Sequence, residues 1–98
     1  METIEIKSIS GKTLYSHTCK NNTLKTTLEK AVFEKVNLSY ANLKNANLRN
    51  AILTNAILIG ANFRKANLKN TNFKNAVLID ANLGGAYLQN TNLTDTIF

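Results

Sequence analysis

A leucine or phenylalanine recurs at every fifth position over nearly two-thirds of this 98-residue chain. The thirteen positions are Leu38, Leu43, Leu48, Leu53, Leu58, Phe63, Leu68, Phe73, Leu78, Leu83, Leu88, Leu93 and Phe98. An α-helix, at about 3.6 residues per turn, would spread such a series around its whole surface. A β-strand would send alternate members to opposite sides, because five is odd. All thirteen side chains can leave water only if the backbone turns a corner every five residues.

The other positions of the five-residue unit support this interpretation. Two residues before each Leu or Phe stands a small residue, which is Ala in nine of the thirteen units. The residue directly before is Asn in eight of them, and we expect these amides to stack in a ladder along the coil. The small and the large residue point inward from one short extended side. Such a side buries its apolar groups only against neighbouring coils, so the unit predicts a stacked solenoid.

Two consecutive units, Ala41-Asn42-Leu43-Lys44-Asn45 and Ala46-Asn47-Leu48-Arg49-Asn50, resemble the pentapeptide-repeat family. The resemblance implies a mainly β fold, a right-handed quadrilateral β-helix with four units in each coil. On this basis residues 36–98 form a β-solenoid and residues 1–35 an N-terminal cap, within a single domain. The chain departs from the family in carrying Asn where many members carry Asp.

Residues 1–35 lack the period of five. Ile4 and Ile6 alternate with polar residues, residues 10–12 offer a turn, and residues 13–16 are strand-like, which together predicts a β-hairpin. Because the hairpin precedes the first coil, we expect it to cover the open strand edge of that coil.

Residues 23–35 fit two interpretations. Leu24, Leu28, Ala31 and Val32 have helical spacing, and Asn22 or Thr23 is available as an N-cap. The same segment also fits further five-residue units, at residues 26–28 and 31–33. We favour a short helix.

The last unit stops at Phe98, on an inward position, and no cap comparable to residues 1–35 follows it. An open solenoid end exposes core side chains together with unpaired backbone groups. We therefore expect a homodimer that forms end to end, an arrangement that the family resemblance also implies.

The cellular setting is predicted from a few features. The single cysteine, Cys19, cannot form an intrachain disulfide, which favours a reducing compartment. Acidic residues at the start do not fit a secretory signal, and no stretch approaches the roughly 18 apolar residues of a membrane span. We expect a cytoplasmic protein without membrane association.

No catalytic, metal-binding or cofactor-binding site is predicted. His17 and Cys19 are two apart on a strand, but no further His or Cys completes a set of metal ligands. With four units per coil, Asp80 and Asp95 fall on different sides and cannot work as an acid–base pair. The paired glycines at 84–85 lack a phosphate-loop pattern. We expect a protein that is not an enzyme and carries no cofactor.

Residues twenty apart should stack on one face of such a coil. Outward-facing apolar residues then align, and they form a candidate interface together with the terminal Phe98: Ile57, Ile59, Val77, Ile79 and Ile97. Two explanations stand. The face meets a second copy or an unidentified protein, or the hairpin covers it through Ile4 and Ile6.

The chain has a net charge of +6, and most of the excess lies in residues 36–98. Six outward-facing residues form a candidate basic patch: Lys44, Arg49, Arg64, Lys65, Lys69 and Lys74. Such a patch suits phosphate groups. No aromatic residue is expected among them for base stacking, so we interpret the patch as a solvated face, with nucleic-acid binding as an alternative.

The function predicted from these features is a non-catalytic scaffold that acts through protein–protein contact. The family resemblance offers a different function, since some members mimic DNA and bind type II topoisomerases. Mimicry needs a strongly negative surface, so the charge of +6 argues against it.

Overall fold

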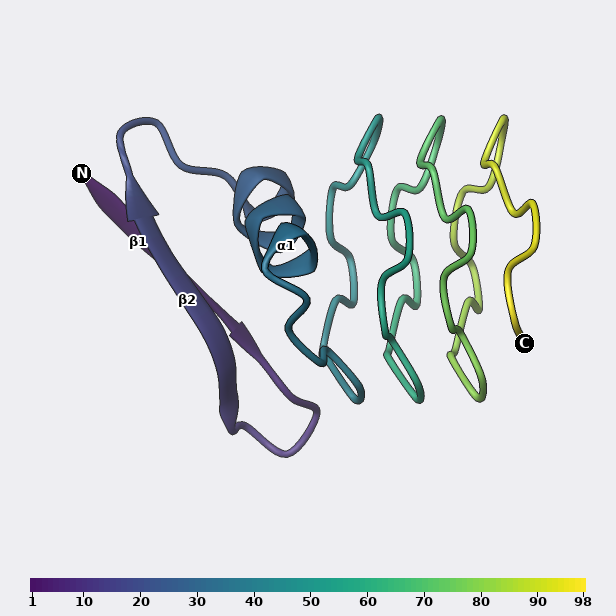
Figure 1. Ribbon diagram of the computed structural model, residues 1–98, viewed down its shortest axis with the longest axis horizontal. Helices are drawn as coiled ribbons and strands as arrows, with labels where there is room; N and C mark the ends of the chain where they lie inside the picture. Colours follow the sequence, from purple (N-terminus) through teal and green to yellow (C-terminus); the bar gives the residue numbers. More distant parts are fainter.

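The chain folds into a cap followed by a stack of coils. A computed structural model describes residues 1–98 and contains strand β1 (Glu2–Lys7), strand β2 (Thr13–Cys19) and helix α1 (Leu24–Phe33). The remaining chain winds through successive coils away from α1, so the two termini lie at opposite ends of the molecule (Figure 1). The one helix, α1, has 10 residues and does not qualify as a membrane-spanning segment.

Backbone pairing within the stack joins residues twenty positions apart. Parallel bridges connect Asn42 with Asn62 and Asn62 with Asn82. The N–H of Leu43 donates to the carbonyl of Asn62 at 2.8 Å, and the N–H of Asn62 donates back to the carbonyl of Ala41 at 2.9 Å. Since the unit is five residues long, each coil contains four units.

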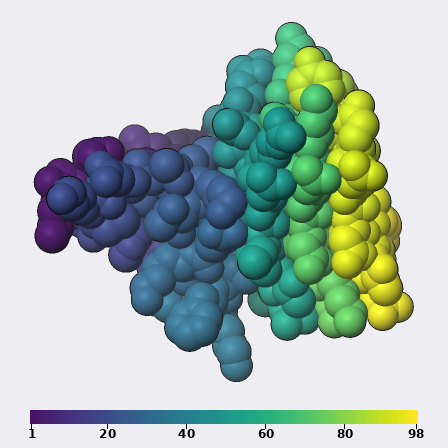
Figure 2. Space-filling view, turned by 90° about the horizontal axis from the view of Figure 1, so that it is seen from above, coloured from purple at the N-terminus to yellow at the C-terminus, as the bar shows by residue number.

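Units that stack at this spacing form columns, which are numbered here in chain order. The first column holds residues 36–40, 56–60, 76–80 and 96–98, the second 41–45, 61–65 and 81–85, the third 46–50, 66–70 and 86–90, and the fourth 51–55, 71–75 and 91–95. In the space-filling view, successive coils appear as parallel layers beyond the cap (Figure 2).

Each corner between units is a tight turn with one left-handed residue. At the first corner the N–H of Ala41 donates to the carbonyl of Leu38 at 3.1 Å, and Tyr40 has a φ of 66°. A positive φ at the third of four residues is the signature of a type II turn. The same position has a positive φ in every later unit: Asn45, Asn50, Asn55, Gly60, Lys65, Asn70, Asn75, Asp80, Gly85, Asn90 and Asp95. Asn, Asp and Gly tolerate this conformation best, which explains their abundance there.

The asparagines that precede the large apolar residues act locally. Each of the eight accepts a hydrogen bond, through Oδ1, from the backbone N–H two residues later, at 2.9–3.3 Å. Asn62 Oδ1, for example, accepts a hydrogen bond from the N–H of Arg64 at 3.0 Å. The predicted ladder of amides along the coil is therefore wrong, because the side-chain oxygen is already engaged in its own turn.

The interior of the stack holds the five-residue series, as predicted. Leu48 and Leu68 are fully buried, and Phe63 meets Phe73 edge to face with ring centroids 5.7 Å apart. Thr replaces the small Ala in three units and bonds across the coils: the Thr71 hydroxyl donates to the carbonyl of Leu48 at 2.8 Å. A buried hydroxyl is thus satisfied without disturbing the backbone ladder.

The hairpin and the helix cover the first coil. β1 and β2 pair in antiparallel register, and the end of β1 lies on the coil edge, where the N–H of Asn42 donates to the carbonyl of Lys7 at 2.8 Å. Ile6 and Leu28 are buried in the same apolar cluster as Leu38. The cap thereby closes an edge that would otherwise be open to other strands.

Residues 24–33 adopt the helical alternative. Thr23 is the N-cap, and its hydroxyl accepts from the N–H of Thr26 at 3.1 Å. Leu28 and Ala31 face the core, as helical spacing requires. Phe33, which a five-residue unit would have turned inward, is instead 79% exposed. The helix also reaches the coil through Glu29, whose Oε2 accepts from the N–H of Ile52 at 2.7 Å.

Candidate interaction surfaces

The aliphatic residues predicted to form an interface lie together in the first column. Bridges join Ile57 to Val77 and Val77 to Ile97, so the three occupy neighbouring coils. Ile57 is 36% exposed and Ile97 52%, while Ile79 stands exposed beside them. Ile59 and Val77 are half-buried. The register that collects these residues follows from the twenty-residue coil.

The hairpin does not cover this column. Ile6 is buried in the core under the cap, and Ile4 is half-buried in β1, opposite His17 of β2. The hairpin instead lies beyond α1, at the end of the molecule that holds the first coil (Figure 1). The alternative of cover through Ile4 and Ile6 is therefore wrong, because Ile6 packs into the core at the end of the stack and Ile4 stays within the hairpin.

A groove between α1 and the first two coils extends the apolar face. It has a volume of about 830 Å³, and its walls include Val32, Phe33, Ile52 and Ile57. Ile52 is 63% exposed. Since Ile57 belongs both to the groove and to the first column, the two are continuous. We call the combined set the apolar surface: Phe33, Ile52, Ile57, Val77, Ile79 and Ile97.

Sequence reasoning missed the groove half of this surface. Ile52 did carry a signal, because it occupies an outward position where most units have Asn. Phe33 carried no such signal in the sequence, because its exposure depends on where α1 ends relative to the fourth column.

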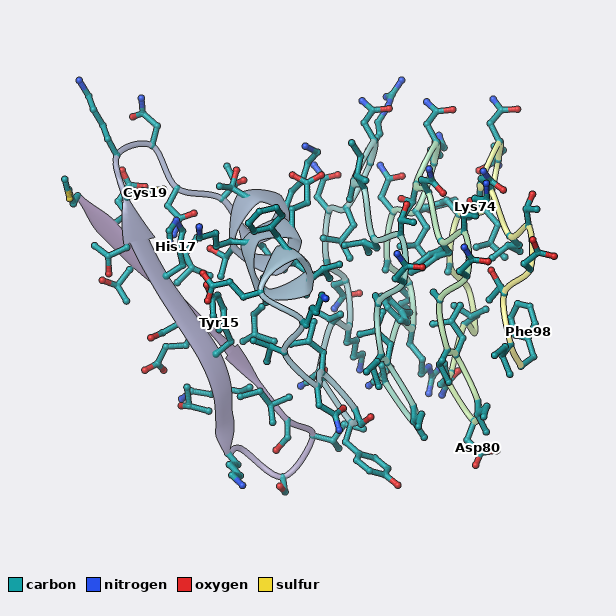
Figure 3. The ribbon with its side chains drawn as sticks, viewed as in Figure 1. Tyr15, His17, Cys19, Lys74, Asp80 and Phe98 are labelled. Carbon is teal, nitrogen blue, oxygen red and sulfur yellow. The ribbon has the colours of Figure 1, made fainter.

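The last coil has an open edge. The N–H groups of Leu83, Leu88 and Leu93 have no hydrogen-bond acceptor, whereas the equivalent N–H of Phe63 donates to the carbonyl of Asn82 at 2.8 Å. Phe98 is 64% exposed and lies at the end of the molecule opposite the cap (Figure 3). Exposed apolar groups and unpaired donors thus occur together at this end.

The six basic residues occupy three columns. Lys44, Arg64 and Lys65 stand in the second, Arg49 and Lys69 in the third, and Lys74 in the fourth. None of them forms an ion pair, because the three ion pairs of the protein all lie within the cap.

An aromatic residue does lie among these cations, contrary to prediction. Tyr87 pairs with Asn67 of the preceding coil in the third column, and its side chain is 53% exposed. Lys69 Nζ lies 5.4 Å from the centre of its ring, a cation–π distance. Sequence reasoning overlooked Tyr87 because it replaces the Asn that most units carry at this outward position.

The remaining polar candidates stay apart. His17 and Cys19 lie on β2, while Asp80 lies in the coils, in the first column (Figure 3). Asp95 belongs to the fourth column. No group of three His, Cys, Asp or Glu side chains is close enough to hold a metal ion. Burial raises the pKa of the Tyr15 phenol, and the neighbouring Glu34 carboxylate raises that pKa further.

Comparison with known proteins agrees with the repeat geometry. A family model described as pentapeptide repeats matches residues 25–55 and 56–95, in eight copies. The match begins inside α1, so its first residues fit the repeat in sequence but are helical in structure. A search of curated proteins found no match.

Proposed function

Because the chain belongs to the pentapeptide-repeat family, we propose that it is a non-catalytic scaffold that acts through protein–protein contact. The observation that carries the proposal is the apolar surface. It runs from Phe33 and Ile52 beside α1 to Ile97 in the last unit, and all its members are exposed except Val77, which is half-buried. Contiguous apolar patches of this kind mark interaction sites.

The proposal includes the shape of the scaffold. We take residues 36–98 to be a right-handed quadrilateral β-helix, closed by residues 1–35 as part of the same domain. The twenty-residue register and the equivalent turns at all corners support four sides of equal length. A reducing, cytoplasmic location fits the single cysteine.

We also propose that two copies associate through their last coils, which leaves the apolar surface free for another protein. The unpaired N–H groups of Leu83, Leu88 and Leu93 and the exposed Phe98 support this assignment. An isologous contact would cover the same groups on both copies.

Sedimentation velocity over a range of protein concentrations tests the dimer. The wild-type protein should shift from monomer to dimer as concentration rises, and Phe98→Asp should stay monomeric, because a buried unpaired charge opposes association. Ile9→Asp is the matched control, since Ile9 is exposed on the cap loop. A wild-type protein that remains monomeric at every concentration would contradict the dimer.

Partner capture tests the role of the apolar surface. Immobilised wild-type protein and the Ile9→Asp control should retain the same protein from host extract, and Ile57→Asp/Ile79→Asp should lose it while keeping the wild-type circular-dichroism spectrum. If the double variant retains that protein as well as the control does, contact through the apolar surface is excluded.

A further inference from the structure

We propose that the second and third columns form a binding surface for single-stranded nucleic acid, separate from the apolar surface. Five cations occupy these two consecutive columns: Lys44, Arg64, Lys65, Arg49 and Lys69. The polyanion would lie along the stack, with its phosphates on the cations and a base on Tyr87.

The backbone ladder fixes the relative positions of the backbone at the residues that carry the cations. Lys44 and Arg64 belong to neighbouring coils, which are joined where the N–H of Asn45 donates to the carbonyl of Arg64 at 2.9 Å. Arg49 and Lys69 are related in the same way, through the N–H of Asn50 and the carbonyl of Lys69 at 3.0 Å. Strands paired in this way lie about 4.8 Å apart. The surface is therefore preorganised, and binding needs little ordering of the protein backbone.

The charge on these columns is available to a ligand. None of the five cations is ion-paired, and the only acidic residues of the coils, Asp80 and Asp95, lie in the first and fourth columns. Gly84 and Gly85 follow Arg64 and Lys65 in the second column and have no side chains to cover them. Phosphate oxygens can therefore approach both cations.

Tyr87 distinguishes a single strand from other polyanions. Its ring is 53% exposed and lies beside Lys69 in the third column. Exposed aromatic rings stack on unpaired bases, whose faces a duplex keeps buried. An acidic protein surface would satisfy the cations but would leave the ring without a stacking partner. The combination of cations and aromatic ring favours single-stranded nucleic acid.

The first experiment measures the affinity of the wild-type protein for a fluorescein-labelled 20-nucleotide oligothymidine by fluorescence anisotropy. Five phosphate contacts predict a slope of about −3.5 for log K against log salt concentration, which is about 100-fold weaker binding at 200 mM than at 50 mM salt. A protein that does not bind the probe at 50 mM salt overturns the proposal. Tighter binding to a duplex of the same length also overturns it.

Two triple variants with the same net charge locate the surface. Lys44→Gln/Arg64→Gln/Lys65→Gln should reduce the slope to about −1.4, because two contacts remain. Lys12→Gln/Lys20→Gln/Lys35→Gln removes three exposed cations of the cap that form no ion pair, and should keep the wild-type slope. Equal loss in both variants, each with the wild-type circular-dichroism spectrum, would show a general charge effect and overturn the assignment.

The contribution of base stacking is tested with Tyr87→Leu. This variant should bind the oligonucleotide about fivefold or more weakly with an unchanged salt slope, since stacking involves no phosphate. Labelled polyglutamate of matched charge should bind the wild-type protein more weakly and should not respond to Tyr87→Leu. If polyglutamate binds as tightly as the oligonucleotide and Tyr87→Leu affects neither, the surface recognises acidic proteins, and the proposal for nucleic acid fails.

Discussion

At the residue scale, the fifth position of each unit decides whether the chain can turn. Asn75, for example, has a φ of 60°, and its N–H still reaches the carbonyl of Thr94 at 3.1 Å. The left-handed region is costly for residues with a Cβ, except where a short polar side chain stabilises it locally. Lys65 and Tyr40 occupy the same position without that advantage. They show that stacking between coils can impose the turn on an unfavourable residue.

Replacement of Asn75 tests this account. Asn75→Ala should destabilise the protein by about 1 kcal/mol, because Ala lacks the local polar contacts that make the left-handed region accessible, whereas Asn75→Gly should stay close to wild type. Urea unfolding followed by circular dichroism gives both values. Lys74→Ala, at the preceding exposed position, is the control and should have little effect. Equal stability of the Ala and Gly variants would refute the role of φ.

At the scale of elements, α1 replaces a missing coil. In the second coil the N–H of Asn72 donates to the carbonyl of Ala51, one coil earlier, at 2.9 Å. Ile52 occupies the same place in the first coil and has no earlier coil, so the Glu29 carboxylate accepts its N–H at 2.7 Å. The other Glu29 oxygen bonds Lys25 at 3.2 Å within the helix. The Glu29 side chain thus accepts the first-coil N–H in the fourth column, as the carbonyl of Lys7 at the end of β1 does in the second.

Substitution of Glu29 should loosen this junction. Glu29→Ala removes the acceptor and should lower the free energy of unfolding by about 1–2 kcal/mol, and Glu29→Gln should lower it less because an acceptor oxygen remains. Lys25→Ala removes only the partner of an exposed helical ion pair and should cost about 0.5 kcal/mol or less. Chemical unfolding of the three variants measures these losses in free energy of unfolding and checks their order. A loss in Lys25→Ala equal to that in Glu29→Ala would assign the effect to the ion pair instead.

The contact between the hairpin and α1 predicts a dependence of stability on alkaline pH. The pKa of Tyr15 is raised by burial and then by Glu34, so the folded protein holds the phenolic proton more tightly than the unfolded chain does. This contribution is present below the unfolded pKa of about 10 and is lost as the pH rises through the folded pKa. Urea midpoints between pH 9 and 11.5 should therefore fall more steeply in the wild type than in Tyr15→Phe. If the urea midpoints of the two proteins fall in parallel with pH, the contribution of Tyr15 is refuted.

At the scale of the whole molecule, burial of the inward side chains decreases from the capped end to the open one. Leu48 and Leu68 are completely buried in the third column, but Leu88, which follows them, is 39% exposed. Each coil is covered on both sides only where another coil or the cap adjoins it, as expected for a solenoid stabilised by nearest neighbours. The last coil is therefore the part of the stack with the least support.

Hydrogen exchange should report this gradient. At micromolar concentration the amides of Leu43 and Leu53, which donate to the next coil, should be strongly protected. Those of Leu83 and Leu93, which have no acceptor, should exchange quickly. Protection of the latter pair at higher concentration is the outcome that end-to-end association requires. Equal protection of all four at the lowest concentration would contradict the open end.

The sequence alone determined the periodic part of this protein. Burial of a large apolar side chain at every fifth residue leaves only a coil with regular corners, so the inward Leu series followed from spacing. The alignment of Ile57 with Ile97 needed, in addition, the four units per coil that the family resemblance implied. The tertiary structure decided the rest, because contacts between residues far apart in the chain leave no local pattern. Only it placed Glu29 against Ile52, turned Phe33 outward, and set Tyr87 beside Lys69. The groove exists because the coil and the cap meet where no repeat specifies the outcome. Tyr87 meets Lys69 within the coils themselves, where neighbouring coils bring residues of the third column together.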